Sequence, residues 1–269
     1  MDDLRLMCIL AHPDDEALGC GFTLAKVASE GVHITLICAT RGERGWQGVP
    51  EVFPGEVALG KIREAELLEA SRVLGIREVV FLDYLDGDLS RVNALEAVGK
   101  IAREIRRVRP QVVVTFDPSG AYGHPDHIAI SQFSLGAVLA AADIGYIDAA
   151  GFAPHRVEKV YYMVDTVELV QMVKETIGPI SMEVGGAVRE HFGWPAWAVT
   201  TRINAVDYWE TGLKGIACHH TQVSGILDQL YRLPETHDPG VWANQTFYRV
   251  FSLVPVKGSL ETDLFEGLR

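Results

Sequence analysis

Two short stretches of the chain combine imidazole and carboxylate side chains around a proline. Residues 11–16 read Ala-His-Pro-Asp-Asp-Glu, and residues 122–127 read Tyr-Gly-His-Pro-Asp-His. Each stretch directly follows an apolar run that is typical of a buried strand. Open α/β sheets bind their ligands at the carboxyl ends of strands. Because imidazole and carboxylate groups are both metal ligands, the two stretches together predict a metal site.

The first stretch offers metal ligands and a base. His12 and Asp15, held on one tight turn by Pro13, can bind a zinc ion, and His127 of the second stretch is the natural third ligand. A catalytic zinc site keeps a position open for water or substrate. Asp14 diverges from its neighbour Asp15 and can act as the general base toward that water. The same ligand set also accepts iron(II), cobalt or nickel.

The second stretch offers groups that stabilise developing charge. His124 can present a positive or hydrogen-bond-donating edge to an oxyanion, and Asp126 can hold its tautomer. A simpler interpretation is that Asp14 or Asp15 only caps a helix that begins near Glu16. Two such motifs at two predicted strand ends favour the metal site.

Apolar runs alternate with amphipathic helical patterns along the chain. Strands are predicted at Leu4–Ala11, His33–Thr40, Val79–Leu82, Gln111–Phe116, Val157–Val164, Trp197–Ile203 and Thr246–Leu253, and helices at Glu16–Glu30, Leu59–Leu74, Ala94–Val108, Ile128–Ala142 and Val206–Cys218. This alternation predicts an α/β fold of three layers, a Rossmann-like and mostly parallel sheet with helices on both faces. With the usual strand order 3-2-1-4-5, the first and fourth strands are neighbours, which brings the two motifs together.

We expect a single domain over residues 1–269, with a core at 4–165, a variable lid or insert at 166–196 and C-terminal elements at 197–269. Glycines and prolines predict long loops at Arg41–Gly55 and Gln229–Asn244. The first of these loops and the lid are expected to wall a substrate pocket.

Composition narrows the class of partner. The chain has 269 residues and a formal net charge of −12, which argues against nucleic acid and anionic membranes and favours a small molecule. No run of about 20 apolar residues is uninterrupted, and the first residues lack the basic segment of a signal peptide. We therefore expect a cytoplasmic protein. The four cysteines contain no C-x-x-C pair and are expected to be buried thiols.

These motifs resemble a known family. Ala-His-Pro-Asp-Asp-Glu, followed by Gly19 and Gly21, and the later His-Pro-Asp-His resemble the zinc-dependent N-acetylglucosaminyl deacetylases related to the glycosylphosphatidylinositol de-N-acetylase, the LmbE-like or PIG-L family. Further matching elements are Thr40-Arg41-Gly42-Glu43, Ile62-Arg63-Glu64 with Glu66, Asp86-Gly87 and His219-x-Thr221-Gln222. Together they cover most of residues 4–142 and the region 200–222.

The resemblance implies a role for each site residue. It implies that His12, Asp15 and His127 bind zinc, that Asp14 is the base, and that His124 stabilises the oxyanion with Asp126 as its orienting partner. It also implies substrate contacts from Arg63, Tyr122, Glu43 and His219. For the last of these, the sequence does not decide between His219 and the adjacent His220. The implied reaction is removal of an acetyl group from an N-acetylglucosamine-type amino sugar or conjugate, and the resemblance allows a homo-oligomer.

Other functions remain open at this point. A zinc amidase acting on another N-acyl substrate, such as a thiol conjugate, would use the same residues. A non-catalytic metal-binding protein would leave Asp14 and His124 unused, because a structural site fills its fourth position with a protein ligand. A nucleotide-binding oxidoreductase is disfavoured because no G-x-G-x-x-G follows the first strand.

Overall fold

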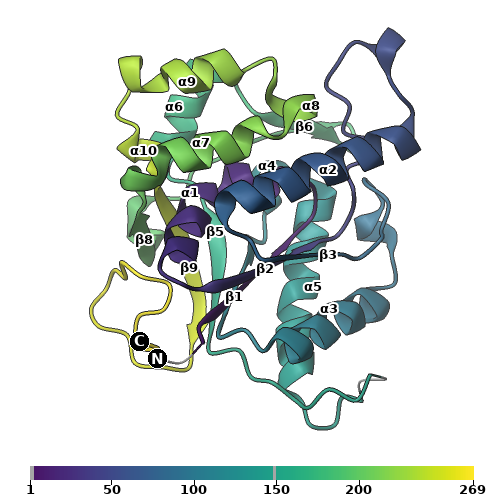
Figure 1. The fold of residues 1–269 in the computed structure, drawn as a ribbon, viewed down its shortest axis with the longest axis vertical. Helices are drawn as coiled ribbons and strands as arrows, with labels where there is room; N and C mark the ends of the chain where they lie inside the picture. The colour runs from purple at the N-terminus through teal and green to yellow at the C-terminus, as the bar shows by residue number, and fades with distance from the viewer. Residues whose placement is uncertain (1–2, 148–149) are drawn as a thin grey trace.

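A seven-stranded sheet forms the middle layer of the computed structural model (Figure 1). The structure describes residues 3–147 and 150–269; residues 1, 2, 148 and 149, the first two of which belong to the amino-terminal segment considered above, lie outside it. The strands are β1 (Arg5–Leu10), β2 (His33–Cys38), β3 (Glu78–Phe81), β4 (Val112–Phe116), β5 (Lys159–Val164), β8 (Thr201–Asn204) and β9 (Asn244–Ser252).

The strand order is β3-β2-β1-β4-β5-β9-β8, with parallel pairing from β3 to β5 and antiparallel pairing of β9 to both neighbours. The predicted order 3-2-1-4-5 and the predicted adjacency of the first and fourth strands are confirmed. The register places Cys8 of β1 between Leu36 of β2 and Val114 of β4.

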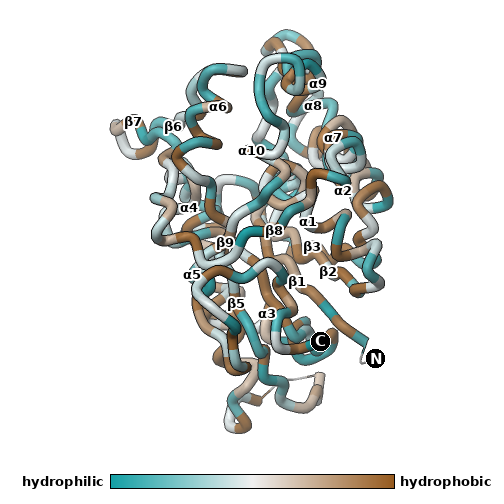
Figure 2. Tube along the Cα trace, turned by 90° about the vertical axis from the view of Figure 1, so that its left-hand side faces the viewer, coloured by the Kyte–Doolittle hydropathy of each residue, from teal (hydrophilic) through white to brown (hydrophobic). Residues whose placement is uncertain are grey.

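Helices cover both faces of the sheet, which explains why most residues of its inner strands are apolar. α1 (Asp15–Ser29), α2 (Glu56–Leu74) and α7 (Trp209–Ala217) pack together on one face, and α3 (Ala94–Val108) packs with α5 (Pro125–Ala142) on the other. Figure 2 shows the hydrophobic, brown segments at β1, β2 and β3 between these layers. The predicted three-layer α/β class is therefore confirmed.

Helix ends follow the local chemistry of the sequence. α2 ends at Gly75, which adopts the left-handed conformation with φ 78° that favours glycine. The side chain of Asn93 caps α3 by accepting hydrogen bonds from the backbone N–H groups of Leu95 and Glu96. α5 begins at Pro125, three residues before the predicted start, because proline suits the first helical position and His124 caps the helix. The second motif therefore opens a helix.

The region after β5 differs most from the prediction. The expected lid at 166–196 contains α6 (Val167–Ile177) and an antiparallel hairpin of β6 (Ser181–Val184) and β7 (Ala187–Glu190). The predicted strand at Trp197–Ile203 is shorter, because residues 196–198 form a 3-10 turn before β8. The loop after β2 contains a similar turn at Pro50–Val52.

The predicted loop at Gln229–Asn244 is wrong. Its residues form most of α9 (Leu227–Thr236), then α10 (Gly240–Ala243) and the start of β9. Pro234 lies within α9, where it lacks the N–H that would otherwise donate to the carbonyl oxygen of Leu230. Burial of Leu230 and Leu233 in the core stabilises the helix despite the proline. Tertiary packing thus overrides the local turn signal.

The described residues also form two shorter helices, α4 (Gly120–Gly123) and α8 (His220–Val223), and 3-10 turns at Leu89–Arg91 and Val206–Tyr208. Within the described ranges, no helix combines the length and the hydropathy that crossing a membrane requires. The four cysteines are free and buried, as predicted.

Candidate metal and catalytic site

The two motifs meet at the carboxyl ends of β1 and β4, as their positions in a parallel sheet predict. Donor atoms of three side chains form a small triangle there, in which Asp15 faces His127 by Oδ1 and His12 by Oδ2. His12 Nδ1 lies 3.2 Å from His127 Nε2, His127 Nε2 lies 3.4 Å from Asp15 Oδ1, and His12 Nδ1 lies 3.7 Å from Asp15 Oδ2. Ligand atoms at zinc bond lengths in tetrahedral geometry are about 3.3 Å apart. The His12–His127 and His127–Asp15 separations therefore match those between ligands of one metal ion, and His12, His124 and His127 also bring ring nitrogens within 4.8 Å of one another.

His12 is held by two carboxylates behind the triangle. Its Nε2 lies 3.1 Å from Asp86 Oδ1 and 3.3 Å from Asp126 Oδ2. Asp126 is itself fixed by hydrogen bonds from the backbone N–H groups of Gly87 and Leu89. Carboxylates that bind the outer nitrogen of a ligand histidine turn its other nitrogen toward the metal. Asp86-Gly87 is among the sequence elements that resemble the family, but sequence reasoning assigned Asp86 no such role.

The charge around His12 also suits a cation. Burial opposes protonation of His12, but hydrogen bonds to Asp126 and Asp86 outweigh it and raise the pKa to about 10. Burial likewise opposes ionisation of Asp15, yet His127 and then His12 hold the pKa of Asp15 well below its usual range. A positive charge is therefore favoured between these groups. The residues present fit a metal in charge as well as in distance.

Asp15 does not serve as an ordinary helix cap. One oxygen, Oδ2, turns back to accept hydrogen bonds from the N–H groups of Ala11 and His12, at 3.1 and 2.7 Å. The other oxygen, Oδ1, faces His127. Asp14 occupies the cap position of α1 but makes no capping hydrogen bond with its side chain. The simpler interpretation of the Asp pair as a cap does not account for these positions.

Asp14 stands beside the triangle in a strained backbone conformation. Its φ is 116°, in a region that residues with side chains rarely adopt. Its carboxylate accepts a hydrogen bond from Arg63 Nη2 at 3.1 Å, and its N–H donates to Glu16 Oε2 at 3.1 Å. Burial raises the pKa of Asp14 to about 6, with Arg63 opposing and Asp15 adding to the rise. A carboxylate with this pKa can accept a proton near neutral pH.

His124 stacks on the ring of His127 and meets the ring of His12 edge-on. Its ring centroid lies 4.7 Å from those of His12 and His127. Its Nδ1 accepts a hydrogen bond from the backbone N–H of Asp126, so the proton of the neutral ring is on Nε2. Burial, together with His12 and His127, lowers the pKa of His124 to about 4. Of the two options open from the sequence, a positive or a donating edge, the structure favours a neutral donor.

The carboxylate of Asp126 differs from its predicted place. We expected it to orient His124, but it contacts His12, and it is the Asp126 backbone that contacts His124. The reason is the start of α5 at Pro125, which aims the N–H of Asp126 at the capping His124. Asp126 therefore contacts both histidines, by different atoms.

Comparisons with known proteins agree with this geometry. A family model described as PIG-L, GlcNAc-PI de-N-acetylase, matches residues 7–138. The 1D-myo-inositol 2-acetamido-2-deoxy-alpha-D-glucopyranoside deacetylase of Thermobifida fusca is 32% identical over 295 residues, which cover 98% of this chain and 100% of the relative. The chain belongs to the PIG-L family.

A second relative supports the PIG-L assignment at higher identity. The deacetylase of the same name from Streptomyces griseus is 39% identical over 303 residues, covering 98% of this chain and 89% of the relative. The N,N'-diacetylchitobiose deacetylase of Pyrococcus horikoshii has the same fold, with a TM-score of 0.68 at 19% identity over 93% of this chain and 84% of that one. The predicted family is confirmed, and the protein is an enzyme, a deacetylase that hydrolyses an amide bond.

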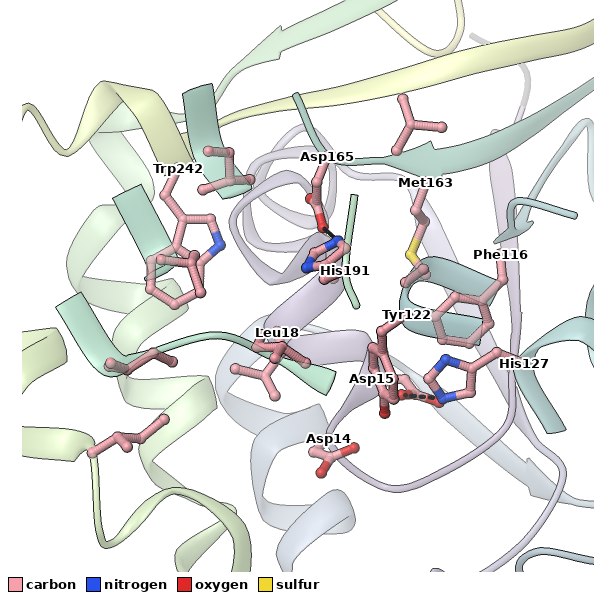
Figure 3. A pocket seen from close by; sticks show the side chains of 18 of the residues that line it. Asp14, Asp15, Leu18, Phe116, Tyr122, His127, Met163, Asp165, His191 and Trp242 are labelled. Carbon is pink, nitrogen blue, oxygen red and sulfur yellow. Dashed lines mark ion pairs between the residues drawn. The ribbon is translucent and has the colours of Figure 1, made fainter. Parts of the chain in front are cut away.

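One cavity of about 390 Å³ adjoins the site of this PIG-L protein. Asp14, Asp15, Tyr122 and His127 line one end of it, as Figure 3 shows. The ring of Tyr122 lies 5.4 Å from that of His127. Tyr122 is thus the predicted substrate contact that the structure places on the cavity wall.

The other predicted substrate contacts lie behind the wall. Arg63 is buried, with 3% of its surface exposed, and donates hydrogen bonds to the carbonyl oxygens of Gly42 and Pro13 as well as to Asp14. It therefore ties the loop after β2 to the loop after β1. Glu43 accepts hydrogen bonds from the N–H groups of Arg41 and Asp86, joining the loops after β2 and β3.

His219, and not His220, is turned toward the site. Its Nε2 lies 2.7 Å from Glu16 Oε1, and both side chains are fully buried. Burial opposes protonation of His219, but Glu16 outweighs it and raises the pKa. Because Glu16 also accepts the N–H of Asp14, the pair supports the base from behind. Sequence reasoning assigned Glu16 no role, since its partner is 203 positions away in the chain.

Proposed function

We propose that this protein is a zinc-dependent hydrolase that removes the acetyl group from an N-acetylglucosamine-type amino sugar or conjugate. The observation that carries the proposal is the donor triangle of His12, Asp15 and His127 with the Asp14 carboxylate beside it at the end of a cavity. The relatives named as deacetylases of an N-acetylated amino-sugar conjugate support the choice of substrate.

Three protein atoms would hold the metal: His12 Nδ1, His127 Nε2 and Asp15 Oδ1. When bound, zinc would act as a Lewis acid on the amide carbonyl and lower the pKa of a water molecule. Asp86 and Asp126 keep His12 in the orientation that this requires. Backbone N–H groups on Asp15 Oδ2 leave its other oxygen free for the same purpose.

Asp14 acts as the general base in this proposal. Its carboxylate takes a proton from the attacking water and later returns it to the departing amine. Arg63 and Glu16 hold Asp14 on either side, by its carboxylate and its N–H. Arg63 and His219 act as positioning residues in this proposal, whereas Tyr122 contacts the substrate.

His124 stabilises the tetrahedral oxyanion by donating from Nε2. Its neutral state suits this role, because the neutral ring already carries the donating proton on Nε2 at neutral pH. A single preorganised donor of this kind contributes roughly a hundredfold to a thousandfold in kcat. Asp126 fixes the donor through the hydrogen bond from its N–H to His124 Nδ1.

A zinc amidase acting on another N-acyl amine is the second candidate, because the same residues would perform the same steps. The cytoplasmic location, the single-domain organisation and a homo-oligomeric assembly stay predictions.

The test is release of acetate and primary amine from methyl 2-acetamido-2-deoxyglucoside by the zinc-loaded protein. Chelator-stripped protein is the control for the metal, and N-acetylcysteine thioethers are the control for the substrate. We expect hydrolysis of the amino sugar that disappears with the metal and returns with zinc. Preferential hydrolysis of the thioethers would favour the second candidate, an amidase that acts on another N-acyl amine. Equal rates of hydrolysis with and without the metal would rule out the proposed metal-dependent mechanism.

A further inference from the structure

The cavity continues well beyond the catalytic end into a part with apolar walls. Leu169, Val173 and Ile177 of α6, Ile226 and Leu230 at α9, and Trp242 of α10 line this part. We call it the apolar chamber. Figure 3 shows it extending from Asp15 and His127 past Leu18 toward Trp242. All six residues lie outside the stretch 7–138 that matches the family model.

Few polar groups border the chamber, and Asp165, His191 and Thr176 among them are engaged with other protein atoms. Asp165 Oδ2 lies 2.9 Å from His191 Nε2, and these two residues stand between the catalytic end and Trp242. The hydroxyl of Thr176 donates to the carbonyl oxygen of Met172 at 2.8 Å. His191 Nδ1 is buried without a partner among the described residues. One such atom cannot match the several hydroxyl groups of a sugar or cyclitol, which would lose more contacts with water in the chamber than they gain, and this is unfavourable.

We propose that the apolar chamber binds an alkyl or aryl substituent of the amide substrate. The inference rests on the proposed function and names a narrower substrate class: an N-acyl amine with an extended apolar group. This differs from the substrate in the relatives' names, whose inositol ring carries hydroxyl groups. The group is attached either on the acyl side of the amide or on the amine side, as the aglycone of an amino sugar.

Burial of methylene groups sets the expected size of the effect. Each methylene that enters the chamber should raise kcat/KM about fourfold, which corresponds to about 0.8 kcal/mol. The rise should stop once the chamber is full. A polar group added at the same distance along the substituent should reverse the gain.

Two homologous substrate series test the proposal. One lengthens the acyl group of glucosamine amides from acetyl to octanoyl, and the other lengthens the aglycone of alkyl N-acetylglucosaminides from methyl to octyl. We expect kcat/KM to rise with length in one series, which also identifies the side that carries the group. If the methyl and acetyl members are hydrolysed but kcat/KM does not change with length in either series, the proposed role of the chamber is wrong. The proposed function would be unaffected.

Variants of α6 tie the effect to the chamber. Val173→Phe should fill part of it and abolish the length dependence, and Val173→Thr should weaken it with little change in shape. Val167→Phe is the matched control, because Val167 lies on the same helix, is 54% exposed and does not line the cavity. An equal length dependence in all four proteins would overturn the proposal.

A binding measurement separates this inference from the reaction. Metal-free protein is titrated with N-alkylacetamides of increasing length, followed by tryptophan fluorescence, with Trp242→Phe to assign the signal. We expect the Kd to fall about fourfold per methylene. This binding result does not depend on hydrolysis. If no substrate were hydrolysed, only the proposed function would be contradicted. A Kd that does not change with chain length would contradict the proposal that the chamber binds an apolar substituent.

Discussion

The catalytic end of the cavity and the apolar chamber are built on different principles. At the catalytic end, loops that follow parallel strands present histidines and carboxylates, and hydrogen bonds fix the directions of the Asp15, Asp126 and Glu16 carboxylates. The chamber is lined by apolar side chains of α6, α9 and α10, among them the buried Leu230 and Trp242. The catalytic residues and the residues proposed to select the substrate therefore lie in separate parts of this chain.

The largest effect should come from the catalytic end. Asp14→Asn removes the base but keeps the shape, so we expect kcat to fall about a hundredfold to ten-thousandfold. Metal content, measured by atomic absorption, should not change, because Asp14 lies outside the donor triangle. Asp88→Asn, a half-buried carboxylate on the loop after β3, is the matched control. Normal turnover by Asp14→Asn would remove Asp14 from the mechanism.

A core variant in the chamber should act on stability. Leu230→Ala removes a side chain that is 2% exposed, and we expect the free energy of unfolding to drop by about 2–5 kcal/mol. Leu139→Ala, at a residue that is 70% exposed, should change it by less than about 0.5 kcal/mol. Urea denaturation measures both. Metal affinity should stay the same in Leu230→Ala, and a clear loss would mean that the two regions are coupled.

A smaller effect should follow from loosening His12. Asp126→Asn weakens the contact with His12 Nε2, and we expect metal affinity to fall about tenfold to a hundredfold. Competition with a zinc chelator of known affinity measures it. Retention of full affinity would show that Asp86 alone orients His12.

The smallest expected change is the change in kcat/KM for each unit of pH. Asp14 must be ionised to act as a base, and its pKa is raised to about 6. Activity should therefore be full above this pKa and fall about tenfold per pH unit below it. A profile of kcat/KM against pH checks this, with metal content followed at each point. An acid limb near pH 4 would contradict the raised pKa.

Sequence reasoning succeeded where a local pattern determines the structure. Apolar runs located β1 and β4 within one or two residues, and their adjacency brought His12 and His127 together. It failed where the outcome depends on tertiary packing. The direction of the Arg63 side chain and the pairing of Glu16 with His219 depend on contacts between distant segments.

The chamber was out of reach for the same reason. Its residues carry no motif, and Pro234 led to the prediction of a loop where α9 stands. Hydrophobic side chains on a helix look the same whether they fill a core or line a cavity. Only the packing of α6 against α9 shows that some of them border open space.

The place of β9 in the sheet has a consequence for biosynthesis. β9 is the last strand in the chain, yet it lies between β5 and β8. Until residues 244–252 leave the ribosome, the outer edge of β5 has no partner, and β8 cannot join the sheet through β9. An unpaired strand edge is a template for aggregation. In the nascent chain, the edge of β5 therefore stays open to such association until the last strand has been made.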